Sequence, residues 1–88
     1  MTRKPNEPDL TKFLGRVAAE IRRRREKRKM SVLDAASAAG MPAPTWYRWE
    51  QGKGLPLDAL PAIAETLGCL ERDLLPRGQL AIAMELSQ

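Results

Sequence analysis

The stretch Gly40-Met-Pro-Ala-Pro-Thr-Trp-Tyr-Arg-Trp-Glu-Gln-Gly52 decides the fold of this chain. It places a short helical segment between two glycines. Gly40 can take a positive φ without steric cost, so the chain can turn sharply there. Upstream, residues 31–39 supply another helical segment that begins at Ser31, a good N-cap residue. Together the two segments predict a pair of short helices joined by a turn at Gly40.

The segment between the two glycines has two distinct helical faces. Trp46 and Trp49 are three residues apart, so we expect both indole rings on one buried face. Tyr47 and Arg48 then project outward. Pro44 falls in the first turn, where its missing N–H group has no intrahelical partner to lose. The second helix of the pair is therefore predicted to have one exposed face and an opposite face that is buried through its two tryptophans.

Three further segments predict helices on either side of this pair. Apolar residues at intervals of three and four favour a long helix over about residues 10–29. Downstream, we expect a helix over residues 57–67 with Leu57 on its core face, and a short fifth helix over residues 70–75. The expected fold is all-α, with five helices around one core.

The last part of the chain is more apolar than a solvated tail requires. Its large apolar residues alternate as in a strand, whereas its composition favours a helix. Such a tail either folds back over its own core or forms a seam between two subunits. We favour the seam, and the candidate dimerisation residues are Leu80, Ile82, Met84 and Leu86.

Composition excludes several classes of protein. The chain has 88 residues, the size of one small domain, and one cysteine, which cannot form an internal disulfide. It contains no histidine, and no spacing of cysteine and carboxylates resembles a metal site. No apolar run is long enough for a secretion signal or a membrane span. We expect a cytoplasmic binding protein that is not an enzyme and uses no metal or other cofactor.

Positive charge is concentrated in the predicted first helix. Residues 12–29 carry nine basic side chains against two acidic ones, a net charge of +7, whereas the whole chain has a net charge of +4. Basic residues near a helix C-terminus complement the helix dipole, but this role needs far fewer charges. An anionic partner is therefore the better explanation.

A set of residues spread over most of the chain carries a family resemblance through its order and spacing. These residues are Ile21, Arg25, Met30, Ser31, Ala35, Ala36, Gly40, Met41, Trp46, Trp49, Glu50, Gln51, Gly52, Lys53, Pro56, Leu60, Ile63, Ala64, Leu67, Gly68, Cys69, Leu74 and Leu75. The set resembles the Cro and phage-repressor (XRE) helix-turn-helix domain. The resemblance implies a lambda-repressor-like fold and a sequence-specific regulator of double-stranded DNA, a repressor acting as a homodimer on an inverted-repeat operator.

The resemblance also implies roles for individual residues, since the second helix of such a pair lies in the major groove. The base-reading positions of the family are occupied here by Ala43, Pro44, Thr45, Tyr47 and Arg48. Phosphate contacts fall to Lys27, Arg28, Lys29, Ser31, Gln51 and Lys53. Arg25 and Glu50 occupy positions that commonly form a partly buried ion pair between the first helix and the recognition helix.

Five positions depart from the family pattern, and two of them, Ala43 and Pro44, are apolar where long polar base-reading residues are frequent. Val32 replaces a residue that is often a phosphate-binding glutamine, and Lys29 stands where a glycine commonly turns out of the first helix. Arg24 stands where a leucine would fill the core. Base reading would then depend mainly on Arg48, with the remaining specificity coming from DNA shape.

Such limited base reading leaves a second class of function open. The chain is alternatively a protein-interaction module, such as an antitoxin or a regulatory partner, that uses the exposed surface of the helix pair. Docking of the basic helix to an acidic membrane is a weaker alternative, because residues 31–75 form a complete domain that such a role does not require. Along the chain we expect a flexible arm over residues 1–9, the DNA-binding domain over residues 10–76 and the tail over residues 77–88.

Overall fold

The computed structural model describes residues 7–76 of the chain. In this part of the chain all regular structure is helical. The α-helices are α1 (Phe13–Lys27), α2 (Val32–Ala38), α3 (Ala43–Glu50) and α4 (Leu60–Leu67), and the 3-10 helices are η1 (Leu57–Ala59) and η2 (Glu71–Leu74). The candidate dimerisation residues of the tail, Leu80, Ile82, Met84 and Leu86, lie outside the described residues.

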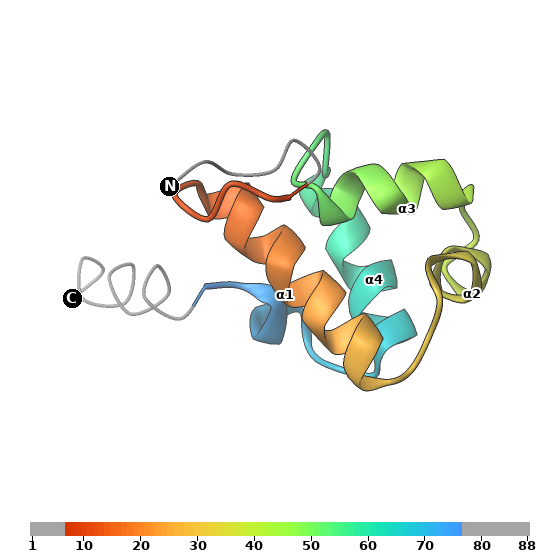
Figure 1. Cartoon of the computed structure of the whole chain (residues 1–88). Helices are drawn as coiled ribbons and strands as arrows, with labels where there is room; N and C mark the ends of the chain where they lie inside the picture. Colours follow the sequence, from red (N-terminus) through yellow and green to blue (C-terminus); the bar gives the residue numbers. More distant parts are fainter. Residues whose placement is uncertain (1–6, 77–88) are drawn as a thin grey trace.

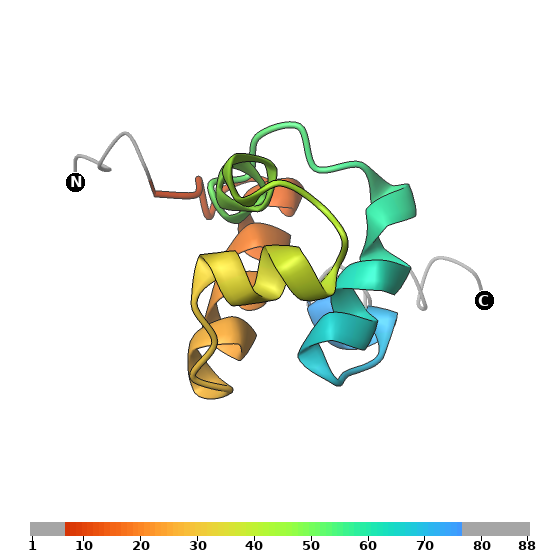
Figure 2. The same ribbon diagram turned by 90° about the vertical axis from the view of Figure 1, so that its right-hand side faces the viewer.

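The helix pair α2 and α3 packs against a frame made by α1 and α4. Figure 1 shows α1 and α4 side by side, with α3 across one end and α2 beside them. Turned by 90°, the same arrangement shows α2 in front of α1, and η2 folded back beside the C-terminal end of α4 (Figure 2). The arrangement leaves one side of α3 uncovered.

One hydrophobic core joins these elements. Its largest fully buried side chains are Trp46, Ile21, Ile63, Leu74 and Val17. They come from α1, α3, α4 and η2, while α2 contributes two small residues, Ala35 and Ala36, both completely buried. The expected burial of both tryptophans is confirmed, since Trp49 is 9% exposed.

All four α-helices end in the same hydrogen-bonded motif. At the end of α2 the N–H group of Met41 donates to the carbonyl of Ala36 at 2.9 Å, and the intervening Gly40 has a φ of +74°. This is the Schellman arrangement, in which a left-handed residue follows the helix. The residues in the left-handed conformation at the other three ends are Lys29, Gly52 and Gly68.

The start of α1 lies later than the sequence predicts. The carboxylate of Asp9 accepts from the backbone N–H and the hydroxyl of Thr11 at 3.0 and 2.6 Å, which closes a turn in place of a helical turn. This turn folds over α1 at Gly15, where a Cβ atom would collide with the carbonyl of Asp9. The absence of a side chain at Gly15 therefore allows the close approach.

The predicted five-helix count is corrected by the structure, which has four α-helices in the described part of the chain. The fifth segment is a single 3-10 turn, η2, in which Asp73 accepts from the N–H of Leu70 at 3.0 Å before the chain reaches Pro76. Such short segments do not favour the α conformation over the 3-10 one.

The prediction for residues 57–67 is also corrected at its start. The first turn is the 3-10 helix η1, and Leu57 is 59% exposed instead of lying on the core face. Pro61 explains the difference, because it has no N–H group to donate to the carbonyl of Leu57 in an α-helical turn. The α-helix therefore begins at Leu60, with Pro61 in its first turn. Among residues 7–76 no helix is long and apolar enough to cross a membrane.

Candidate nucleic-acid interface

The uncovered side of α3 is formed by three of the five predicted base-reading residues. Pro44, Tyr47 and Arg48 are exposed, and their spacing places them on one helical face. Tyr47 is 48% exposed. Ala43 and Thr45 are only half-buried, and Ala43 packs against the hydrophobic core. The face available to a ligand is therefore narrower than the sequence suggests.

An ion pair ties this helix to α1. The structure brings Arg25 and Glu50 together, with two guanidinium nitrogens donating to the two carboxylate oxygens at 2.6 and 3.0 Å. The side chains are 12% and 5% exposed. A third donor reaches the same carboxylate, because the indole N–H of Trp46 donates to it at 2.5 Å. Glu50 thus accepts from both helices at once.

Arg25 also fixes the chain that leaves α1. Its Nη1 donates to the carbonyl of Met30 at 2.8 Å, at the link to α2. The hydrogen bond to Glu50 raises the pKa of Arg25 above its usual value, so the guanidinium stays charged at every accessible pH. One side chain therefore positions the start of α2 and the end of α3 relative to α1.

Most of the predicted phosphate-contacting residues are exposed at helix ends. Lys27, Lys29 and Lys53 are exposed and form no ion pair within residues 7–76. Gln51 is half-buried. The hydroxyl of Ser31 accepts from the N–H of Asp34 at 3.0 Å, so it caps α2.

Arg28 has a different environment from the lysines. Its Nη1 donates to the carbonyl of Leu67 at 3.2 Å, at the C-terminus of α4. A Cβ atom at Gly68 would collide with this guanidinium, which lies directly over the helix end. This hydrogen bond uses one of the five N–H donors of the exposed Arg28 guanidinium.

A small cleft brings several of these residues onto one surface. It has a volume of about 110 Å³ and is lined by Arg22, Arg25, Val32, Tyr47, Glu50 and Gln51. The start of α2, the outer face of α3 and the end of α3 therefore meet beside α1. Arg22 was not among the predicted site residues, although its position three residues before Arg25 places it on the same side of α1.

A second groove extends this surface along the start of α1. It has a volume of about 410 Å³, and Lys12 lines it together with Gln51 and Lys53. Gly52 approaches α1 closely here, since a Cβ atom would lie 3.3 Å from the Cα atom of Gly15. Sequence analysis missed Lys12 because nothing in the sequence relates the start of α1 to the loop after α3.

Comparisons with known proteins agree with this geometry. The profile of a helix-turn-helix domain family matches residues 16–78. The crystal structure of apo-HppE is 34% identical, with a TM-score of 0.68, and the match covers 74% of this chain and 37% of that chain. A hypothetical transcription factor, NHTF from Neisseria, is 21% identical, with a TM-score of 0.71 over 92% of this chain and 97% of that chain. No curated protein matches the sequence.

Proposed function

The chain belongs to the helix-turn-helix domain family, and from this premise we propose that it is a regulator of transcription that binds double-stranded DNA through α3. In such domains the second helix of the pair enters the major groove and its first residues meet the base edges. The finer proposal is a repressor that acts as a homodimer on an inverted-repeat operator. A similar fold occurs in NHTF, a hypothetical transcription factor.

The observation that carries this proposal is the exposed face of α3 beside cationic side chains. The exposed side chains that can approach a DNA groove are those of Pro44, Tyr47 and Arg48. Two exposed lysines, Lys29 and Lys53, follow the ends of α1 and α3, where the phosphates of the DNA backbone would pass. Phosphate neutralisation supplies affinity that does not depend on sequence, and base contacts add specificity.

In this proposal Arg48 is the main base reader. Its guanidinium can donate two hydrogen bonds to O6 and N7 of a guanine, and Pro44 can contact a thymine methyl group. Tyr47 and Thr45 assist. Ala43 faces the core in part, so its contribution is small.

The experiment is a selection of bound duplexes from a random library, followed by binding measurements on the preferred site. Arg48→Ala should lose about 1–3 kcal/mol on that site and little on random duplexes. The matched variant Lys53→Gln should weaken both alike and reduce the slope of log K against log salt by about one. Equal losses of Arg48→Ala on both duplexes would make Arg48 a phosphate contact and contradict its assigned role.

Two exposed apolar side chains favour a second candidate, a protein-interaction module. Leu33 on α2 is 68% exposed and Tyr47 on α3 is 48% exposed. Tyrosine is among the residues that carry most of the binding energy at protein interfaces, and Leu33 adds exposed apolar surface to the helix pair. Salt-insensitive binding to a protein, without any salt-dependent binding to duplexes, would support this candidate over DNA binding.

The match to HppE transfers no activity to this chain, which spans 37% of that protein's length.

A further inference from the structure

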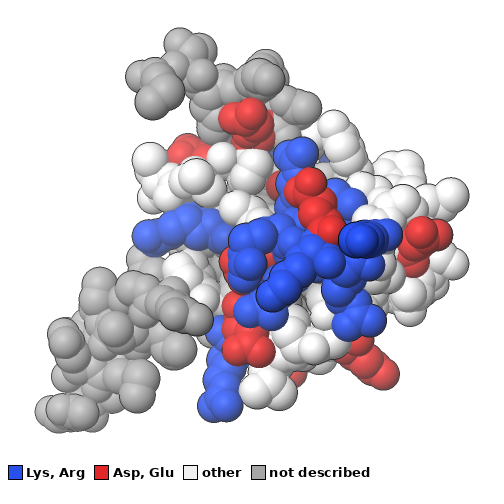
Figure 3. All heavy atoms as spheres, turned by 60° about the horizontal axis from the view of Figure 1, so that its bottom comes forward, with Lys and Arg blue, Asp and Glu red and all other residues white. Residues whose placement is uncertain are grey.

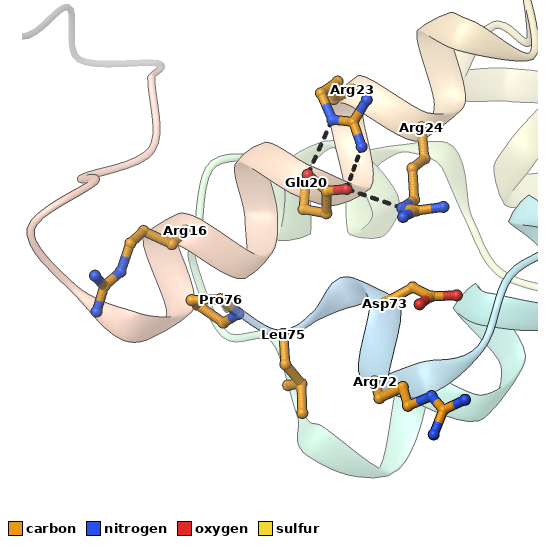
Figure 4. Close-up of a pocket in the computed structure, with 8 residues that line it drawn as sticks. All are labelled: Arg16, Glu20, Arg23, Arg24, Arg72, Asp73, Leu75 and Pro76. Atoms are coloured by element: carbon orange, nitrogen blue, oxygen red, sulfur yellow. Dashed lines mark hydrogen bonds and ion pairs between the residues drawn. The ribbon is translucent and has the colours of Figure 1, made fainter. Parts of the chain in front are cut away.

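A polar pocket lies between α1 and η2, away from the cleft beside α3. Its volume of about 330 Å³ falls within the usual range of about 300–1,000 Å³ for small-molecule sites. It is lined by Arg16, Glu20, Arg23, Arg24, Arg72, Asp73, Leu75 and Pro76. Figure 4 shows Arg16 at one end and Arg72 with Asp73 at the other, with Leu75 and Pro76 between them.

The two acidic residues of this pocket already have partners. Glu20 accepts from Arg23 at 2.5 Å and from Arg24 at 2.9 Å. These contacts lower the pKa of Glu20 below its ordinary value, so the carboxylate is ionised at neutral pH. One oxygen of Asp73 accepts from the N–H of Leu70 at 3.0 Å, which caps η2.

Two arginines of the pocket therefore remain without a carboxylate within residues 7–76. Neither Arg16 nor Arg72 forms an ion pair there. The Nε of Arg16 is in addition buried and has no hydrogen-bond partner. A guanidinium that has no acceptor within the protein leaves its positive charge uncompensated beside the pocket, which favours an anionic ligand there.

The arginines of α1 are divided between this pocket and the cleft beside α3 by their positions around the helix. Arg22 and Arg25 line the cleft beside α3, whereas Arg23 and Arg24 line the pocket beside η2. Seen from the lower side of the molecule in Figure 1, Lys and Arg side chains form a large exposed cluster with a few acidic side chains among them (Figure 3). The positive charge of α1 therefore lies on two different sides of the helix.

We propose that this pocket binds a small molecule that carries phosphate groups. A phosphate monoester has a charge of about −1.5 to −2 at pH 7, which is opposite to the net charge of +2 of the lining residues, four arginines minus two acidic residues. Guanidinium groups bind phosphate oxygens through pairs of N–H donors. The apolar side chains of Leu75 and Pro76 offer a surface for the organic part of such a ligand.

The test is titration of the full chain with inorganic pyrophosphate in the absence of DNA, followed by calorimetry and by backbone amide shifts. Amides near Arg72 and Arg16 should shift. Arg72→Gln, an exposed substitution, should weaken pyrophosphate binding at least about tenfold, while Arg22→Gln on the other side of α1 should have little effect. Absence of binding, or equal losses in the two variants, would overturn the proposal, because the probe would then respond only to overall charge.

A second measurement separates a small ligand from the backbone of nucleic acid, which carries the same phosphate chemistry. Arg72→Gln should leave duplex affinity and its salt slope unchanged. If it instead reduces the slope as much as Lys53→Gln does, the pocket belongs to the DNA footprint and the proposed ligand is wrong. Pyrophosphate binding does not depend on duplex binding, so either proposal can fail alone.

Discussion

Lys29 has the left-handed backbone conformation that glycine adopts at the ends of the other three α-helices. Its φ is +58°, and no other non-glycine residue between positions 7 and 76 has a positive φ. For a residue with a side chain this conformation is unfavourable by about 1–2 kcal/mol. The phosphate contact proposed for Lys29 would explain a lysine at this strained position.

Lys29→Gly should therefore separate stability from binding. We expect the free energy of unfolding to rise by about 1 kcal/mol, because glycine adopts this φ freely. Duplex affinity should fall on all sequences, with a salt slope smaller by about one. Denaturant melts and salt titrations measure the two effects. Lys27→Gln is the matched control, since it removes a neighbouring charge without relieving strain.

Removal of either partner of the Arg25 and Glu50 ion pair should strongly destabilise the protein. The pair is almost fully buried, so a single substitution leaves an uncompensated charge, and the expected loss is about 3–5 kcal/mol. Arg25→Ala and Glu50→Ala are measured by denaturant melts.

The exposed pair of Arg22 and Glu26 provides the comparison on the same helix. Its side chains are 50% and 57% exposed, and such pairs contribute less than about 1 kcal/mol. If Arg25→Ala is no more destabilising than Arg22→Ala, the buried pair does not anchor α3.

At the scale of single elements, α2 depends on its N-cap. It has seven residues, too few to be stable alone, and Ser31 satisfies one of its free N–H groups. Ser31→Ala should lower the free energy of unfolding by about 1 kcal/mol. Ser37→Ala is the control, because Ser37 lies in the same helix and is exposed without capping it. Equal effects in thermal melts would show that the cap is unimportant.

The pKa of Glu20 gives α1 a pH dependence with a defined sign. The hydrogen bond from Arg23 keeps this pKa below its ordinary value of 4.5, so the pair stabilises the fold above pH 4.5. The contribution is small because both side chains are accessible to solvent, and it is lost as pH falls through the lowered pKa. Glu20→Gln should reduce the loss of stability below pH 4.5. If melts at several pH values show the same loss of stability below pH 4.5 in the variant and in the original protein, this expectation is wrong.

An element can be predicted from the sequence when the residues that determine it lie within a few positions of each other. The helix pair is set by Gly40, Ser31 and the spacing of the tryptophans, all of which act within one or two turns. The apolar pattern predicts the start of α4 three residues too early, because the missing N–H group of Pro61 acts on the turn that precedes it. The contact of Arg28 with Leu67 joins residues 39 positions apart, and no pattern within α1 indicates it. The exposed face of α3 could therefore be predicted from helical spacing, whereas the place of Lys12 beside Gln51 and Lys53 depends on packing between distant segments.

At the scale of the whole molecule, we expect the working unit to be a two-fold dimer. A single domain with one strong base reader covers too short a site to be selective in a genome, and a second copy doubles the contacts. Half-site centres should then lie about 34–36 Å apart, one turn of the duplex. Truncation after Gly78 removes the proposed seam from Leu80 to Leu86 and should yield a monomer that binds a half-site weakly.

Sedimentation of the full and the truncated chain distinguishes the possible seams. A truncated chain that still forms dimers would place the interface on the folded domain, where the exposed Leu57 and Leu70 are the candidates. A full chain that stays monomeric on its operator would contradict the two-fold arrangement.

The two tryptophans also allow the buried face of α3 to be followed by fluorescence. Trp46 and Trp49 are the two tryptophans of the sequence, and their ring centroids lie 6.4 Å apart in the core. The indole N–H of Trp46 is bound to the same carboxylate that Arg25 holds. Release of that carboxylate would hydrate an indole that is now dry and shift its emission to longer wavelength. The protein therefore carries an intrinsic fluorescent reporter of whether its recognition helix is docked, and no attached dye is needed to follow it.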